Sequence, residues 1–368
     1  MSNEIMSEKS PVVEQTAVTS QRRYDIDWLR TLALGLLILY HVVISFQSWG
    51  YTIGFPQNEP TLDSLWIWMA MINVWRIPIL FVVSGMGVAF AMRRRTWKQL
   101  LLDRTVRILL PFLFGYFAIA PIVAYGSMIF YGIEPVYLPG TAHLWFLGNI
   151  FAYVLLLLPL LMWMKKRPNN PLLRFFTRLV QLPGGIFLFA LPLIVEALLV
   201  NPVEYVTYAD TAHGFWLGLV CFFIGFLFIS LKDEFWQRVI KLRGVALLLA
   251  FSGYVWRFSA YQLVGVPNGF IALESMLWML AILGFGANNL NRASPQLVYW
   301  NTAVYPVYIL HLPIQFWLAL LILPLALPAE LKLLLLLAGT LGGSLLLYEL
   351  VLKRVRWLRP FFGLKFAG

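Results

Sequence analysis

The chain has 368 residues, of which 60% are hydrophobic and only 12% are charged, and its mean hydropathy is +0.76. These charged residues are too few to coat a water-soluble protein of this length, so the composition excludes a soluble globular protein and indicates one that lipid surrounds. A formal net charge of +11 would suggest a nucleic-acid partner in a soluble protein. Here the basic residues lie in short clusters between apolar runs, as topology signals do in a membrane protein, so we predict no nucleic-acid partner.

The N-terminal segment, residues 1–21, is polar and lacks periodicity, which predicts a disordered cytoplasmic tail. Arg22 and Arg23 then precede an apolar run that is too long for a signal-peptide core and has no small-residue cleavage site after it. We therefore expect an uncleaved first helix. Cys221 is the single cysteine, so an intrachain disulfide is excluded, and its place inside an apolar run argues against a thiol metal site.

Ten apolar runs are long enough to cross a membrane. About 20 apolar residues span the hydrocarbon layer as a helix, which satisfies its backbone hydrogen bonds internally. We therefore predict an all-α polytopic membrane protein with about ten transmembrane helices in a domain at 22–360, followed by a cytoplasmic tail at 361–368. The predicted helices run from Trp28 to Trp49, Leu65 to Met92, Ile108 to Phe130, Leu144 to Met164, Leu179 to Val200, Phe215 to Leu231, Val245 to Tyr261, Phe270 to Ala287, Val298 to Leu321 and Leu331 to Leu352.

The loops between these runs alternate in charge. Every second connection carries Lys or Arg, whereas the intervening loops contain neither. Because basic loops stay in the cytoplasm, this pattern and the even number of helices both place the two termini on the cytoplasmic side. The basic connections lie at 22–23, 93–107, 165–178, 232–243, 292 and 353–365, and the other loops hold Asp63, Glu134, Glu204 and Asp210.

The first predicted helix carries ionisable residues along one face. Arg30 and His41 are eleven residues apart, which is about three helical turns, so they share a face at a separation of about 16 Å. Asp27 lies on the same face three residues before Arg30. Ionisable groups at membrane depth are costly and usually functional, so this face predicts a polar track from the cytoplasmic surface into the bilayer. In the alternative reading, Asp27 and Arg30 keep their charges at the interface and His41 is a buried structural histidine.

Three further arginines are candidates for function. Arg76 lies in the middle of the second run with Pro78 two residues later, which favours a broken or water-lined segment, the alternative being a structural ion pair. Arg104 and Arg107 are spaced i, i+3 at the inner end of the third helix and could hold phosphates, although a topology signal alone would explain a basic cluster. The other ionisable residues inside the runs are too scattered for roles to be assigned: Glu196, Arg257, Glu274, His311 and Glu349.

The outer end of the fourth helix begins with His143 and Trp145, a combination that by itself is typical of an interfacial aromatic belt. No HExxH, paired CxxC or Walker-type loop occurs in the sequence. We therefore predict no metal and no prosthetic group.

Taken in chain order, these segments resemble the acyltransferase 3 family of membrane-bound O-acyltransferases. The shared features are the Arg30-x10-His41 spacing, Arg76-Ile77-Pro78 leading into 81–85, and Arg104-Thr105-Val106-Arg107. The segments from His143 to Leu147 and from Tyr308 to His311 are similar to the sugar-modifying branch, including the glucan biosynthesis protein C type. The resemblance covers essentially Arg22 to Leu352.

This resemblance implies an enzyme of the plasma membrane, in bacteria the inner membrane, that moves an acetyl or succinyl group from cytoplasmic acyl-CoA to a hydroxyl of an extracytoplasmic carbohydrate. The conserved histidine of the family corresponds to His41, and its RxxR arginines correspond to Arg104 and Arg107. A sugar hydroxyl needs a base, and histidine is the side chain best suited to accept its proton near neutral pH, so we predict His41 as the general base. The active site should then be reachable from both sides of the membrane.

The remaining site predictions complete this scheme. Arg30 would hold the CoA phosphates or line their access, and Arg76 would stabilise the thioester oxyanion or bind the free carboxylate of a succinyl donor. We assign acceptor binding to His143, Trp145 and His311. Two other function classes stay open: a secondary transporter would also need intramembrane charges, and a non-catalytic scaffold would not need them. The sequence does not indicate an oligomeric state.

Overall fold

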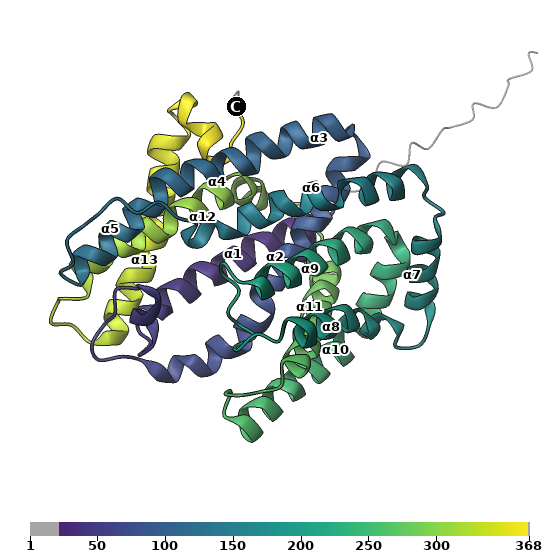
Figure 1. Ribbon diagram of the computed structural model, residues 1–368, viewed down its shortest axis with the longest axis horizontal. Coiled ribbons are helices and arrows are strands. Elements are labelled where there is room, and N and C mark those ends of the chain that lie inside the picture. Colours follow the sequence, from purple (N-terminus) through teal and green to yellow (C-terminus); the bar gives the residue numbers. More distant parts are fainter. Residues whose placement is uncertain (1–21, 367–368) are drawn as a thin grey trace, which may run out of the picture.

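The computed structural model describes residues 22–366, and in this range the regular structure is entirely helical, with no β-strand (Figure 1). No water reaches the backbone in the hydrocarbon layer, so each crossing segment satisfies its own hydrogen bonds as a helix. The predicted all-α polytopic class is confirmed. The predicted disordered tail, residues 1–21, lies outside the described residues.

Nine helical spans of the described chain are long and apolar enough to cross a membrane. They are α1 (Tyr24–Ile44); η2 (Asp63–Leu65) with α2 (Trp66–Arg93); the continuous run α3 (Trp97–Arg104), η3 (Thr105–Leu109), α4 (Leu110–Phe114), η4 (Gly115–Ile119) and α5 (Ala120–Phe130); η5 (Ala142–Leu144) with α6 (Trp145–Lys166); α9 (Ala212–Ser230); α10 (Lys232–Tyr261); α11 (Asn268–Asn289); α12 (Pro295–Ile322); and α13 (Ala329–Leu347) with η7 (Tyr348–Leu352). The shorter elements are η1 (Gly50–Ile53), α7 (Pro171–Gln181), η6 (Gly185–Phe189), α8 (Ala190–Val200) and η8 (Arg356–Phe362).

The fifth predicted helix, Leu179 to Val200, differs from the structure at its start. A Pro-Gly-Gly turn separates the amphipathic helix α7 from η6 and α8, which together form a shorter apolar helix. This helix still joins the two ends of the bundle. At its first end, the carbonyl of Gln181 accepts from Arg238, which lies near the start of α10. At its other end, Asn201 accepts from Asn268, which lies beyond the end of α10.

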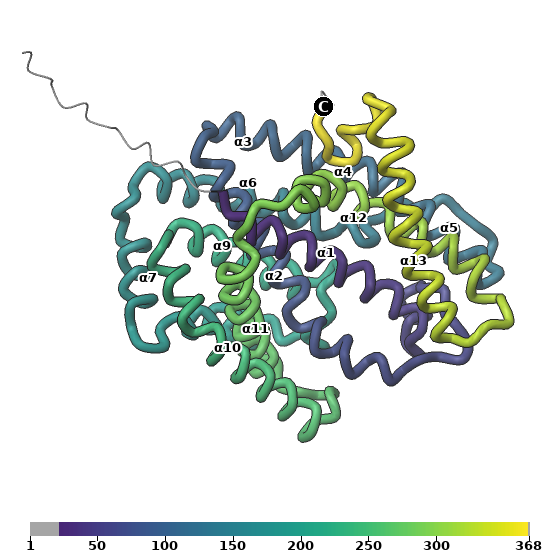
Figure 2. The backbone as a smooth tube through the Cα atoms, turned by 180° about the vertical axis from the view of Figure 1, so that it is seen from behind, coloured from purple at the N-terminus to yellow at the C-terminus, as the bar shows by residue number. Residues whose placement is uncertain are grey.

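Helix α1 lies in the middle of the bundle, beside α2, α11 and α12 (Figure 2). Two glycines bring α2 and α9 together backbone to backbone. A Cβ at Gly85 would lie 1.9 Å from the carbonyl oxygen of Phe222, and one at Gly225 would lie 1.9 Å from that of Val82. Such close approach stabilises helix association in lipid, and it fixes the position of α2, which carries Arg76.

The C-terminal segment packs on the bundle beyond the predicted domain end at residue 360. Helix η8 continues to Phe362. The rings of Phe361 and Phe362 lie 5.0 and 5.5 Å from the ring of Phe114 on α4. The packed region therefore includes the first two residues of the predicted tail.

Candidate active site

A cavity of about 1480 Å³ lies inside the bundle, and its lining includes residues from both ends of α1 and α2. Arg30, Arg104 and Arg107 line what we call the arginine end, and Trp49 and Trp66 line what we call the tryptophan end. His41, Arg76, His143 and Trp145 line the cavity between the two ends. This volume exceeds the roughly 300–1,000 Å³ of a typical small-molecule pocket, so the cavity has room for two substrates at once.

The base predicted from the sequence, His41, is hydrogen-bonded to a second histidine from α12. The Nδ1 atom of His41 lies 2.8 Å from Nε2 of His311, and the two ring planes are parallel to within 2°. Nδ1 of His311 lies 2.6 Å from the backbone carbonyl of Tyr308. A carbonyl only accepts, so His311 donates from Nδ1 and accepts at Nε2 from His41. In neutral His41 the lone pair is therefore on Nε2, which has no hydrogen-bond partner among the described residues.

A third histidine, His143 of η5, packs against the same pair. Its ring centroid lies 4.9 Å from that of His311. Pro313 has no N–H to offer the carbonyl of Ile309, and Nε2 of His143 lies 3.2 Å from this carbonyl and 3.0 Å from that of Tyr308. These contacts make Nε2 the donor, so Nδ1 carries the lone pair, and this buried atom has no partner within the described chain.

Arg76 is a buried cation without a counterion. Its guanidinium donates to Oδ1 of Asn73 at 3.1 Å and lies 3.8 Å from the ring centroid of Tyr40. Within the described chain, its Nε and Nη1 atoms have no hydrogen-bond partner and no carboxylate forms an ion pair with it. Burying an unpaired charge is costly, so this arrangement favours binding of an anion or of a negative charge that develops during a reaction.

The arginine end keeps an excess of positive charge. Arg95, Arg104 and Arg107 share one carboxylate, that of Asp103, at 3.4, 3.9 and 3.2 Å. Three guanidinium groups against one carboxylate leave two positive charges for a ligand. Arg104 ends α3 where the π-helical turn η3 begins, and such turns occur frequently at functional sites.

Arg30 faces the same end of the cavity from α1. It donates to Oδ1 of Asn301 on α12 at 2.5 Å and pairs with Asp27 at 3.3 Å. Asn301 and Tyr305 both line the cavity. Nδ2 of Asn301 and the hydroxyl of Tyr305 are buried and have no hydrogen-bond partner in the part of the chain that the structure describes. No sequence pattern distinguishes these two α12 residues, and we did not predict them as site residues. The same is true of Asn73, a polar residue one turn before Arg76.

The structure brings most of the predicted site residues to one cavity. The exception is His311, which is fully buried behind His41 and does not line the cavity. Its predicted contact with the acceptor does not fit this position, because the ring already bonds His41 on one side and Tyr308 on the other.

The intramembrane groups whose roles were left open lie outside the cavity lining. Arg257 and Glu274 form a buried ion pair at 2.8 Å, Glu196 bonds His213 at 3.0 Å, and the half-buried Glu349 pairs with Lys353 at 2.9 Å. Each group in these pairs has an ionisable partner, whereas Arg76 has none among the described residues. We therefore interpret these pairs as structural.

Comparison with known families gives one finding. A family model described as an acyltransferase domain, the third family of that name, matches residues 23–349. No curated protein and no solved structure gives a significant match.

Proposed function

This chain belongs to the acyltransferase 3 family and is a membrane O-acyltransferase, and we propose that it transfers an acyl group from cytoplasmic acyl-CoA to a hydroxyl of an extracytoplasmic carbohydrate. In this proposal the protein lies in the plasma membrane with both termini in the cytoplasm, as its loop charges favour. The arginine end then faces the donor and the tryptophan end faces the acceptor. The observation that carries the proposal is the single cavity that joins these two ends past His41.

Acyl-CoA would bind with its phosphates on Arg104 and Arg107. The uncompensated charge around Asp103 attracts phosphate, and guanidinium groups bind it in bidentate fashion. Arg30 extends this surface into the cavity. From Arg30 to His41 the helix rises about 16 Å, a distance that the extended pantetheine arm of CoA can cover with its thioester leading.

His41 would act as the general base. Its Nε2 lone pair takes the proton of the acceptor hydroxyl while the hydroxyl oxygen attacks the thioester carbonyl carbon. The negative charge that forms on the carbonyl oxygen is stabilised by the unpaired guanidinium of Arg76. When the carbon–sulfur bond breaks, the imidazolium of His41 returns the proton to the departing sulfur, which gives the ester and free CoA. His311 holds His41 in the required tautomer throughout.

The acceptor would approach on the side of His143 and Trp145. The free Nδ1 of His143 can accept a hydrogen bond from a sugar hydroxyl. Trp145 presents an aromatic wall that is held against Phe81, with ring centroids 6.1 Å apart. Within this class we propose a glucan as the acceptor and an acetyl or succinyl group as the acyl unit, with Arg76 as the partner of the free carboxylate if the donor is succinyl-CoA.

The test uses purified protein in lipid nanodiscs with acetyl-CoA or succinyl-CoA and a soluble gluco-oligosaccharide. We expect ester formation by the unaltered protein and a loss of at least about 100-fold in His41→Ala, because general-base catalysis contributes roughly 10²–10⁴. CoA affinity, measured by calorimetry, should not change, because the phosphates bind at the arginine end. Near-normal turnover in His41→Ala would remove His41 as the base.

A secondary transporter is distinguished in the same preparation. It would move solute across a sealed vesicle without consuming acyl-CoA. Ester formation that depends on His41 contradicts that alternative, whereas solute movement without thioester cleavage contradicts the proposed activity.

A further inference from the structure

The tryptophan end of the cavity has two indole rings in its wall. Trp49 follows α1 and Trp66 begins α2, and their ring centroids lie 5.5 Å apart at an interplanar angle of 79°. In such an edge-to-face pair, the ring that points its edge at its neighbour does not use its own faces for the contact. An aromatic face carries negative charge density and attracts the positively polarised C–H groups of an apolar or sugar ring.

Polar groups lie beside these indoles on the same loop. Asp63 lines the cavity and is solvent-exposed, and its carboxylate accepts from the backbone N–H of Ser48 at 2.7 Å and from the hydroxyl of Thr61 at 2.9 Å. Gln47, also in the cavity wall, donates from Nε2 to the carbonyl of Leu62 at 3.0 Å, whereas its buried Oε1 has no partner among residues 22–366. Both side chains have acceptor capacity left for hydroxyl groups.

Hydrogen bonds hold the loop between α1 and α2 in one conformation. Besides Asp63 and Gln47, the backbone N–H of Leu62 bonds the carbonyl of Phe46 at 2.7 Å, and that of Asn58 bonds the carbonyl of Ser45 at 2.7 Å. Trp49 and Trp66 also pack against the buried core around Val43 and Phe55. The groups are therefore held in place before a ligand arrives, which lowers the entropic cost of binding.

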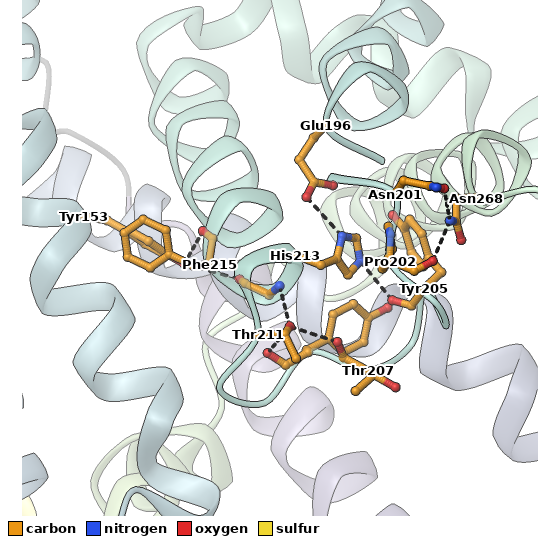
Figure 3. Close-up of polar contacts among 12 residues, drawn as sticks. Tyr153, Glu196, Asn201, Pro202, Tyr205, Thr207, Thr211, His213, Phe215 and Asn268 are labelled. Carbon is orange, nitrogen blue, oxygen red and sulfur yellow. Dashed lines mark hydrogen bonds and ion pairs between the residues drawn. The ribbon is translucent and has the colours of Figure 1, made fainter. Parts of the chain in front are cut away.

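The loop between α8 and α9 also contributes to the cavity wall. Glu204 and Thr207 of this loop line the cavity. Figure 3 shows how the loop is anchored: His213 lies between Glu196, 3.0 Å from its Nδ1, and the carbonyl of Tyr205, 2.9 Å from its Nε2. The loop is therefore part of the cavity wall rather than a free lid.

The loops at the tryptophan end carry negative charge only. The described loops that meet here contain carboxylates but neither Lys nor Arg. Charges of like sign repel over about 8 Å at physiological ionic strength, and Asp63 and Glu204 lie in the cavity wall itself, so an acceptor with carboxylates or phosphates would enter against repulsion. The acidic residues of these loops are Glu59, Asp63, Glu134, Glu204 and Asp210.

We propose that the tryptophan end is a binding subsite for an uncharged sugar unit of the acceptor, with a pyranose ring on the Trp49–Trp66 pair and its hydroxyls on Asp63 and Gln47. This inference rests on the proposed acyl transfer to carbohydrate and adds the residues that select the acceptor. The subsite lies on the acceptor side of His41, so it governs acceptor binding and leaves the donor end unaffected.

The experiment measures transfer from acyl-CoA to a neutral gluco-oligosaccharide and to the same oligosaccharide with its reducing end oxidised to an aldonate, which adds a carboxylate and keeps every C6 hydroxyl. We expect the neutral acceptor to be used at least 10-fold better, as kcat/KM. In Trp66→Ala the KM for the neutral acceptor should rise about 10-fold, equivalent to about 1.4 kcal/mol. Trp66→Phe keeps an aromatic face and should retain most of the affinity. The double variant Asp63→Asn, Glu204→Gln should narrow the preference for the neutral acceptor.

Trp68 provides the matched control. It lies two residues after Trp66, is 63% exposed and does not line the cavity, so Trp68→Ala should leave the acceptor KM unchanged. CoA affinity should be unaltered in the Trp66 variants. An unchanged acceptor KM in Trp66→Ala, or equal use of the two oligosaccharides, overturns the subsite while acyl transfer stands. If the unaltered protein esterifies no carbohydrate with either acyl donor, the proposed function fails and the subsite fails with it.

Discussion

Replacing Arg76 with methionine should separate activity from stability. The substitution keeps an unbranched side chain of similar length and removes the cation. In the native protein this cation has one hydrogen bond, to Asn73 at 3.1 Å, and one ring contact, with Tyr40 at 3.8 Å. It is only 4% exposed and has no ion-pair partner among the described residues.

The expected change in stability is the difference between opposing contributions. Losing the hydrogen bond of a charged donor costs about 1.5–3 kcal/mol, and losing the cation–π contact costs up to about 2 kcal/mol. The desolvation penalty that disappears with the charge is several kcal/mol per ion. We therefore expect the free energy of unfolding of Arg76→Met to fall by less than about 2 kcal/mol, or to rise.

We expect the activity of Arg76→Met to fall. If the guanidinium stabilises the thioester oxyanion, its removal should lower kcat by about 10²–10³-fold, which is about 2.7–4 kcal/mol of transition-state stabilisation. The melting temperature of the purified protein in detergent and the rate of acyl transfer at saturating acyl-CoA measure the two effects separately.

Arg257→Met is the matched control. Arg257 is also a buried arginine, but it donates to Glu274 at 2.8 and 3.1 Å, so its removal leaves a buried carboxylate unpaired and should cost about 3–5 kcal/mol. The folded fraction should keep its kcat, because Arg257 does not line the cavity. Near-normal kcat in Arg76→Met, or a loss of melting temperature equal to that of Arg257→Met, would refute the reasoning.

Two further substitutions test the positioning of the base and the packing of the bundle. His311→Phe keeps an aromatic ring at this position but removes the acceptor at Nε2, so kcat should fall at least about 10-fold with CoA affinity intact. His311→Gln, whose amide oxygen can accept, should retain more activity, and equal rates in the two variants would contradict the positioning role. Gly85→Ala places a Cβ 1.9 Å from the carbonyl oxygen of Phe222 and should cost about 1–3 kcal/mol or more. Gly87→Ala, on the same helix with nothing within 4 Å, should be neutral or stabilising by up to about 1 kcal/mol; similar melting temperatures for the two alanine variants would show that the contact between α2 and α9 is not tight.

The sequence by itself determined the class of the fold and most of its helices. Lipid forces each crossing segment to be helical and about 20 residues long, and this requirement is visible in the apolar runs. The eleven-residue spacing of Arg30 and His41 was sufficient to place both on one face of α1, and both line the cavity. The start of the fifth helix was wrong because Leu179 and Val180, at the end of the amphipathic helix α7, are apolar and made the run before α8 look longer than it is.

The tertiary structure alone decided which polar groups are neighbours. His41 and His311 are separated by 270 residues, and no spacing rule relates residues on helices that meet only after packing. For the same reason, the sequence did not distinguish Arg76, which lacks a carboxylate partner, from Arg257, which has Glu274. Helical periodicity sets the face on which each side chain lies, but the contacts between faces depend on how the helices associate, and here the glycines of α2 and α9 fix one such approach.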